Sequence, residues 1–129
     1  MLAEERKKLV ELYREGYGAV AEALLKITPE EMDVKPGPGK WSVREIIHHL
    51  ADSEMTAAVR LRLLLAQDRP TIQGYDQDEF ARRLYYDRPY QVSLELFQIV
   101  RQSTAEILER LTPAGVTSAH TLGAPTGPS

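Results

Sequence analysis

Apolar residues recur at steps of three and four along three long segments of this chain, and that spacing gathers them on one face of an α-helix. The segments cover residues 4–27, 42–67 and 91–111, and a shorter helix is expected near 76–86. No stretch alternates apolar with polar residues as a half-buried strand does. The sequence therefore predicts an all-α fold, a helical bundle with three long helices.

Helix-capping residues mark where these helices begin. Ser42 and Glu45 form a capping box at the start of the second long helix. Thr28 and Pro29 suit the first positions of a short helical turn. The Pro- and Gly-rich run 35–40 cannot continue a helix, so it is expected to be a loop.

The chain has 129 residues, enough for one domain with its own core. We assign residues 1–116 to the helical-bundle domain and residues 117–129 to a flexible tail, because the tail is rich in Gly, Pro, Thr and Ser. The charged N-terminal run does not resemble a signal peptide, and no apolar run is long enough to cross a bilayer. We therefore expect a cytoplasmic protein with no membrane partner.

The composition excludes several classes of function. The chain has no cysteine, which rules out disulfides and Cys-based zinc sites. It carries 16 basic and 19 acidic residues, so it lacks the positive surplus with which proteins bind phosphate backbones. The sequence also has no phosphate-binding glycine loop and no GxSxG nucleophile elbow. Nucleic acid is not an expected partner.

Two adjacent histidines lie on the second long helix. A helical wheel predicts that His48 points into solvent and that His49 lies at the border of the apolar stripe. A polar strip continues along that border, and bundles build sites at such strips between helices. Two interpretations of His49 stay open: a metal ligand, or a border histidine that donates to a carbonyl or to Glu45. The strip consists of Glu45, Asp52, Ser53, Thr56 and Arg60.

Two charged residues fall on apolar stripes, Glu54 on the second long helix and Arg101 on the last. A buried charge without a partner is very unfavourable, so the two side chains are expected to meet. The alternative is that Arg101 holds an anion in a pocket. On the first helix, Gly16 and Gly18 indicate either a close contact with another helix or a tolerated loss of helix propensity.

Residues 21–29 and 105–113 resemble each other, and each copy ends in Thr-Pro. Chance and common helix-end chemistry account for this equally well. Taken as a repeat, it places the counterpart of His49 after residue 129. We therefore expect that the chain lacks a fourth long helix.

The stretch from Lys40 to Glu54, KWSVREIIHHLADSE, closely resembles the DinB-like superfamily, also called YfiT-like metalloenzymes. Weaker matches extend the resemblance to about residue 119; they are Gly37 to Gly39, Tyr75-Asp76 and Val100-Arg101. The resemblance implies a four-helix bundle that holds a divalent metal, typically nickel or zinc, with three histidines. His49, directly before Leu50, matches the first of these ligands. The other two come from an HxxxH on the fourth helix.

Members of this family include bacillithiol or mycothiol S-transferases and a thiol-dependent isomerase, so the resemblance implies a small thiol or another small-molecule substrate. The HxxxH pair has no counterpart in this sequence. We therefore expect a protein of the metal-dependent thiol S-transferase or hydrolase-like class whose own metal site is incomplete and does not hold metal tightly. The alternative is a non-catalytic helical protein that self-associates or binds a partner.

A homodimer is also expected. With one helix missing, a bundle leaves an apolar strip of several hundred Å² uncovered, more than soluble monomers usually expose. Pairing of like faces about a two-fold axis is the commonest way to cover such a strip. The apolar faces of the second and last helices are the expected contact.

Overall fold

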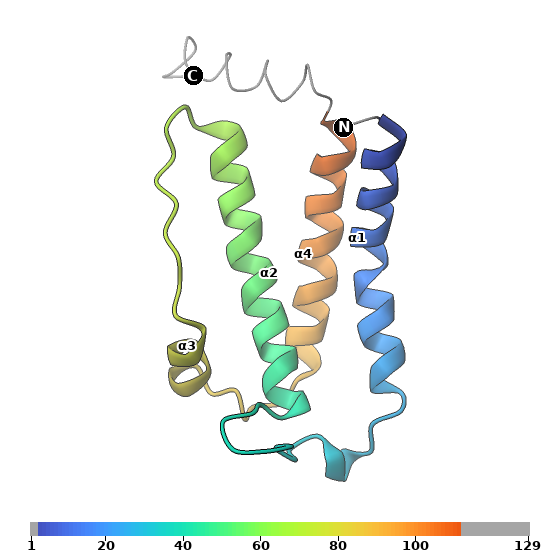
Figure 1. Ribbon diagram of the computed structural model, residues 1–129, viewed down its shortest axis with the longest axis vertical. Coiled ribbons are helices and arrows are strands. Elements are labelled where there is room, and N and C mark those ends of the chain that lie inside the picture. The colour runs from blue at the N-terminus through green and yellow to red at the C-terminus, as the bar shows by residue number, and fades with distance from the viewer. Residues whose placement is uncertain (1–2, 112–129) are drawn as a thin grey trace.

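The computed structural model describes residues 3–111, and these form three long helices that stand side by side with a short helix at one flank (Figure 1). No strand occurs among these residues, which confirms the predicted all-α fold. None of the helices within them is both long and apolar enough to cross a membrane. The elements are α1 (Ala3–Leu24), the 3-10 turn η1 (Pro29–Glu31), α2 (Val43–Ala66), α3 (Gln77–Arg83) and α4 (Gln91–Arg110).

The predicted helix starts are confirmed by their caps. The Ser42 hydroxyl accepts from the Glu45 backbone N–H at 3.2 Å, and the Glu45 carboxylate accepts from the Ser42 N–H at 2.9 Å. Thr28 forms an equivalent capping box at η1. At the other end of α1, residues 25–27 donate to carbonyls three residues back, so the last turn tightens and α1 ends before residue 27.

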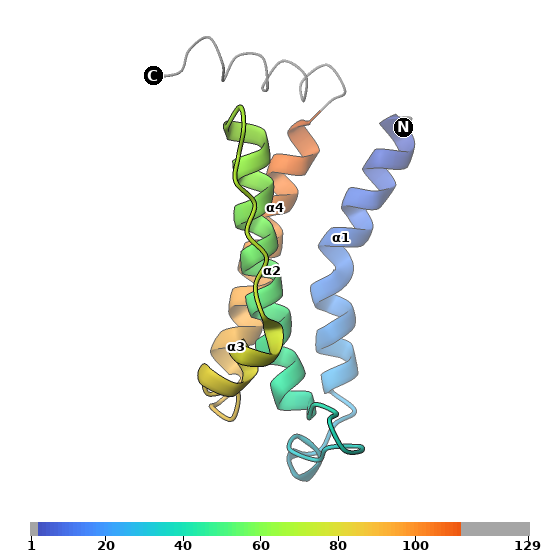
Figure 2. The same ribbon diagram turned by 60° about the vertical axis from the view of Figure 1, so that its left-hand side comes forward.

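The helix α4 lies between its two long neighbours. It packs along α2 and along α1, whereas α1 and α2 make little direct contact with each other. Figure 2 shows α1 standing apart from α2. The buried apolar residues of the three long helices combine a few large side chains with alanines, namely Val10, Ile47, Ala51, Ala58, Phe97 and Ala105.

An apolar groove of about 270 Å³ follows from this arrangement, because nothing in residues 3–111 packs between α1 and α2 on the side away from α4. Its walls include Val20 and Leu24 from α1 and Ile46 and Leu50 from α2. The predicted tail 117–129 lies outside the described residues, as do the end of the assigned domain and the second Thr-Pro pair.

The predicted pairing of Glu54 with Arg101 is confirmed. The Arg101 guanidinium Nη1 lies 2.8 Å from Glu54 Oε1, and Glu54 is only 8% exposed. Tyr13 joins the pair, since its hydroxyl donates to the other Glu54 oxygen. Burial, followed by that hydrogen bond, raises the pKa of Tyr13 to about 12, so the phenol remains protonated as a donor.

Arg101 also binds α1 through the main chain. Its Nε donates to the Tyr13 carbonyl at 2.9 Å, and its guanidinium carbon lies 4.0 Å from the centre of the Tyr13 ring. A Cβ placed on Gly16 would come within 2.6 Å of the guanidinium Nη2, whereas one on Gly18 would meet nothing within 4 Å. Gly16 therefore marks the close helix contact, and Gly18 is a tolerated cost in helix propensity.

This contrast predicts opposite effects for two identical substitutions. Gly18→Ala should raise the free energy of unfolding by up to ~1 kcal/mol through helix propensity. Gly16→Ala should lose that gain and lower the stability, because the added methyl displaces the guanidinium from Glu54. Urea unfolding followed by circular dichroism measures both, and equal stabilisation by the two substitutions would contradict the role of Gly16.

Candidate functional site

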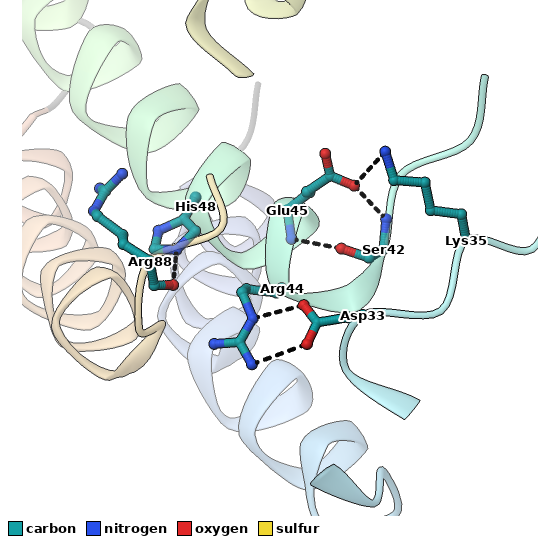
Figure 3. Close-up of polar contacts among 7 residues, drawn as sticks. All are labelled: Asp33, Lys35, Ser42, Arg44, Glu45, His48 and Arg88. Carbon is teal, nitrogen blue, oxygen red and sulfur yellow. Dashed lines mark hydrogen bonds and ion pairs between the residues drawn. The ribbon is translucent and has the colours of Figure 1, made fainter. Parts of the chain in front are cut away.

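His48 is fully buried, so the prediction that it points into solvent is wrong. Its Nδ1 lies 2.6 Å from the Ser93 hydroxyl, and its Nε2 lies 2.9 Å from the Arg88 carbonyl oxygen. Figure 3 shows the ring directed at that carbonyl, away from the loop that precedes α2. The helical wheel failed because it weighed only the apolar residues of α2. The segment before α4 and the first turn of α4 cover this face with polar groups.

The two hydrogen bonds of His48 assign its tautomer. A carbonyl accepts only, so Nε2 carries the proton and Nδ1 accepts from the Ser93 hydroxyl. Burial lowers the pKa of His48, while the hydrogen bond to the Arg88 carbonyl opposes this effect. A neutral His48 with both nitrogens in use ties α2 to α4 and has no lone pair left for a metal.

His49 differs from His48 in its surroundings. It is partly exposed, and its ring packs against that of Trp41 in a T-shaped arrangement with 4.8 Å between ring centres. Its Nδ1 is buried and has no hydrogen-bond partner among the described residues. The predicted alternative, donation to a carbonyl or Glu45, is therefore not realised at this atom.

Glu45 is held elsewhere. Its Oε1 caps the Ser42 N–H and lies 3.7 Å from Lys35 Nζ, as Figure 3 shows. In the same view, Arg44 binds Asp33 at 2.8 Å and fixes the incoming loop against the start of α2. The loop that delivers Trp41 to His49 is thus fastened at two points.

A buried pair that the sequence did not reveal lies one turn further along α2. The Tyr86 hydroxyl donates to Asp52 at 2.6 Å, and both side chains are buried. Burial, followed by this hydrogen bond, raises the pKa of Tyr86. Tyr86 was expected at the end of the short helix, but α3 ends at Arg83 and Tyr85 adopts a positive φ of 57°. That reversal turns Tyr86 inward, toward Trp41 and His48.

The described residues do not fit a complete metal site. Within residues 3–111, no group of three His, Asp or Glu side chains could hold a metal ion. His49 offers one unpaired imidazole nitrogen, whereas structural and catalytic zinc sites use three or four protein ligands. Of the predicted polar strip, Asp52 is committed to Tyr86 and Glu45 to the helix cap.

Comparison with known proteins places this chain among bacterial relatives. The sequence profile of the DinB superfamily matches residues 12–128. A candidate metal-dependent hydrolase of Oceanobacillus iheyensis is 36% identical over 90 residues, which are 70% of this chain and 52% of that protein. Another, from Geobacillus thermodenitrificans, is 30% identical over 113 residues, which are 87% of this chain and 64% of the relative. The chain thus spans roughly half to two thirds of these relatives.

A solved structure matches the fold. YfiT from Bacillus subtilis, described as a candidate metal-dependent hydrolase with an unusual four-helix bundle topology, superposes with a TM-score of 0.81 at 27% sequence identity. The match covers 89% of this chain and 66% of that one. The helical arrangement described above is therefore that of a known bundle.

The hydrogen bond between Ser93 and His48 can be tested directly. Ser93→Ala leaves the buried Nδ1 of His48 without a donor, which should lower the free energy of unfolding by about 1–3 kcal/mol. Ser103→Ala is the matched control, because this exposed hydroxyl of the same helix only accepts from Arg62. Its effect should stay within about 0.5 kcal/mol. Denaturant unfolding that gives equal losses for both would contradict the structural role of His48.

Proposed function

The chain belongs to the DinB superfamily, and from that membership we propose that it is a protein of the metal-dependent hydrolase-like class in which His49 is a metal ligand. The observation that carries the proposal is the unpaired, buried Nδ1 of His49. The relatives from Oceanobacillus and Geobacillus, both named for metal-dependent hydrolysis, support it. Packing against Trp41, whose loop is fastened by the Arg44–Asp33 ion pair, restricts the orientation of the imidazole, which favours a role as ligand.

The finer assignment is thiol S-transferase chemistry with nickel or zinc as the divalent metal and a small thiol as substrate. It rests on the resemblance of the Trp-Ser…His-Leu motif. A bound divalent metal would supply Lewis acidity at this end of α2. One imidazole binds such a metal weakly, so we propose that this chain does not retain it tightly.

Trp41 reports on this proposal because it is the only tryptophan of the chain and lies against His49. Titration with Ni²⁺ should quench its fluorescence, and a chelator or dialysis should restore it. His49→Phe should abolish the quenching, whereas His120→Gln, which removes the third histidine of the sequence, should preserve it.

Two results would count against this proposal. Quenching that persists in His49→Phe, or that is absent from the unsubstituted chain, would overturn the assignment of His49. Near-stoichiometric metal retained by the protein after exhaustive dialysis would contradict the proposal that it binds metal weakly.

The second function we propose is self-association through a groove of about 300 Å³ between α2 and α4, on the pair of helices that the sequence favoured. Met55, Val59 and Ile99 line it, and Ile99 is 58% exposed. Exposed apolar patches of this kind mark interaction surfaces. A second copy is the occupant we propose, since two α2–α4 pairs related by a two-fold axis form a four-helix layer.

Light scattering at micromolar concentration should give twice the chain mass of 14.6 kDa. Ile99→Glu should yield monomers, because it places a charge at the centre of the contact. Val92→Glu is the control, as Val92 is 76% exposed on the same helix but outside the groove. A monomeric unsubstituted chain, or a dimer unaffected by Ile99→Glu, would contradict this function.

A further inference from the structure

A third groove, of about 400 Å³, lies between α2 and the connector that follows it. Figures 1 and 2 both show this connector running back alongside α2 toward α3. Val59 and Leu63 give the groove an apolar wall, and Thr56, Thr71 and Tyr75 bring hydroxyl groups to it. Arg60 is the one charged residue among those that line it.

Arg60 lacks the hydrogen-bond partners that its neighbour Arg62 has. Its Nε is buried without a hydrogen-bond acceptor, and no carboxylate of residues 3–111 lies within ion-pair distance. Arg62, two residues further on, donates to the Ala58 carbonyl at 3.0 Å and to the Thr104 hydroxyl at 3.1 Å. A buried donor without an acceptor is unfavourable, so the position of Arg60 points to an acceptor that comes from outside this part of the chain.

Tyr75 keeps the guanidinium at the groove. The Arg60 guanidinium carbon lies 5.9 Å from the centre of the Tyr75 ring, at the outer limit of a cation–π contact. Tyr75 in turn packs on Phe80 of α3, with 4.6 Å between ring centres. Tyr75, at the end of the connector, therefore lies between Arg60 of α2 and Phe80 of α3.

We propose that this groove binds the carboxylate of a small organic acid, with the carboxylate on Arg60 and the apolar body of the acid against Leu63. The guanidinium fork matches a carboxylate with two parallel hydrogen bonds. A single cation neutralises a carboxylate but leaves a phosphate dianion partly uncompensated. The apolar wall adds a preference for acids that carry a hydrocarbon chain.

The groove lies on the same side of α2 as His49. Arg60 lies eleven positions after His49, which is about three helical turns and about 16.5 Å along the axis at 1.5 Å per residue. An acid held by Arg60 with its hydrocarbon chain against Leu63 would lie at the end of α2 that is distant from His49. Binding of the carboxylate at Arg60 therefore does not rest on the proposed function of His49.

Hexanoate, 1-hexanol and inorganic phosphate are the probes that test the proposal, in ¹⁵N–¹H correlation spectra of the full chain. Hexanoate should shift the amides of Thr56, Arg60 and Thr71 in a saturable manner. Hexanol and phosphate should each bind at least ten-fold more weakly than hexanoate, because hexanol lacks the carboxylate and phosphate lacks the hydrocarbon chain.

Arg60→Gln should weaken hexanoate binding at least ten-fold, while the matched variant Arg62→Gln should bind as the unsubstituted chain does. Unchanged amide positions on α1, which neither arginine contacts through a hydrogen bond or ion pair, verify that each variant is folded. Arg60→Lys, which keeps the charge without the fork, should bind hexanoate more weakly than the unsubstituted chain and more tightly than Arg60→Gln. Equal binding of hexanol and hexanoate, tighter binding of phosphate, or equal losses in both Gln variants would overturn the proposal. Because no metal is added, failure here is distinguishable from failure of His49 as a ligand.

Discussion

The three long helices meet at the guanidinium of Arg101. It pairs with Glu54 of α2, donates to the backbone of Tyr13 on α1, and lies over the Tyr13 ring. Burial of these charges is tolerated because no buried side-chain nitrogen or oxygen at the junction lacks a partner, and the loss of one group would leave another unpaired. The absence of a side chain at Gly16 is part of the same arrangement, since the guanidinium occupies that space. Here a polar junction, more than a large apolar core, determines how α1 sits on the rest.

Most of the fold could be predicted from local signals. The spacing of apolar residues gave the three long helices, and the capping box at Ser42 fixed where α2 begins. The Glu54–Arg101 pair was also predictable, because two opposite charges on buried stripes have few other ways to be satisfied. That argument uses only the cost of burying a charge, and so it does not require the path of any loop to be known.

The candidate site was harder to predict from the sequence than the fold, because loops form much of its surroundings. His49 stood out by its place at the stripe border and by its motif, but the burial of His48 depends on the segment that carries Arg88. The inward turn of Tyr86 depends on the positive φ of Tyr85. Residues other than glycine rarely adopt such a φ, and nothing in the sequence indicates it at this position. Likewise, the groove beside Arg60 exists only because the connector returns along α2. A helical wheel treats each helix as if its surroundings were symmetric, and these loops remove that symmetry.

The central place of α4 has a consequence for synthesis on the ribosome. Both α1 and α2 find their main packing partner in the helix that is last in chain order among the described elements. Until residue 110 has left the exit tunnel, neither earlier helix can bury its stripe, and Arg101 is not yet present to neutralise Glu54. Contacts over such sequence separations are slow to form, because loop closure must precede them. The nascent chain therefore emerges as two amphipathic helices that must remain soluble before α4 is available. The charged residues on their outer faces help to keep them soluble at this stage as well as in the folded protein.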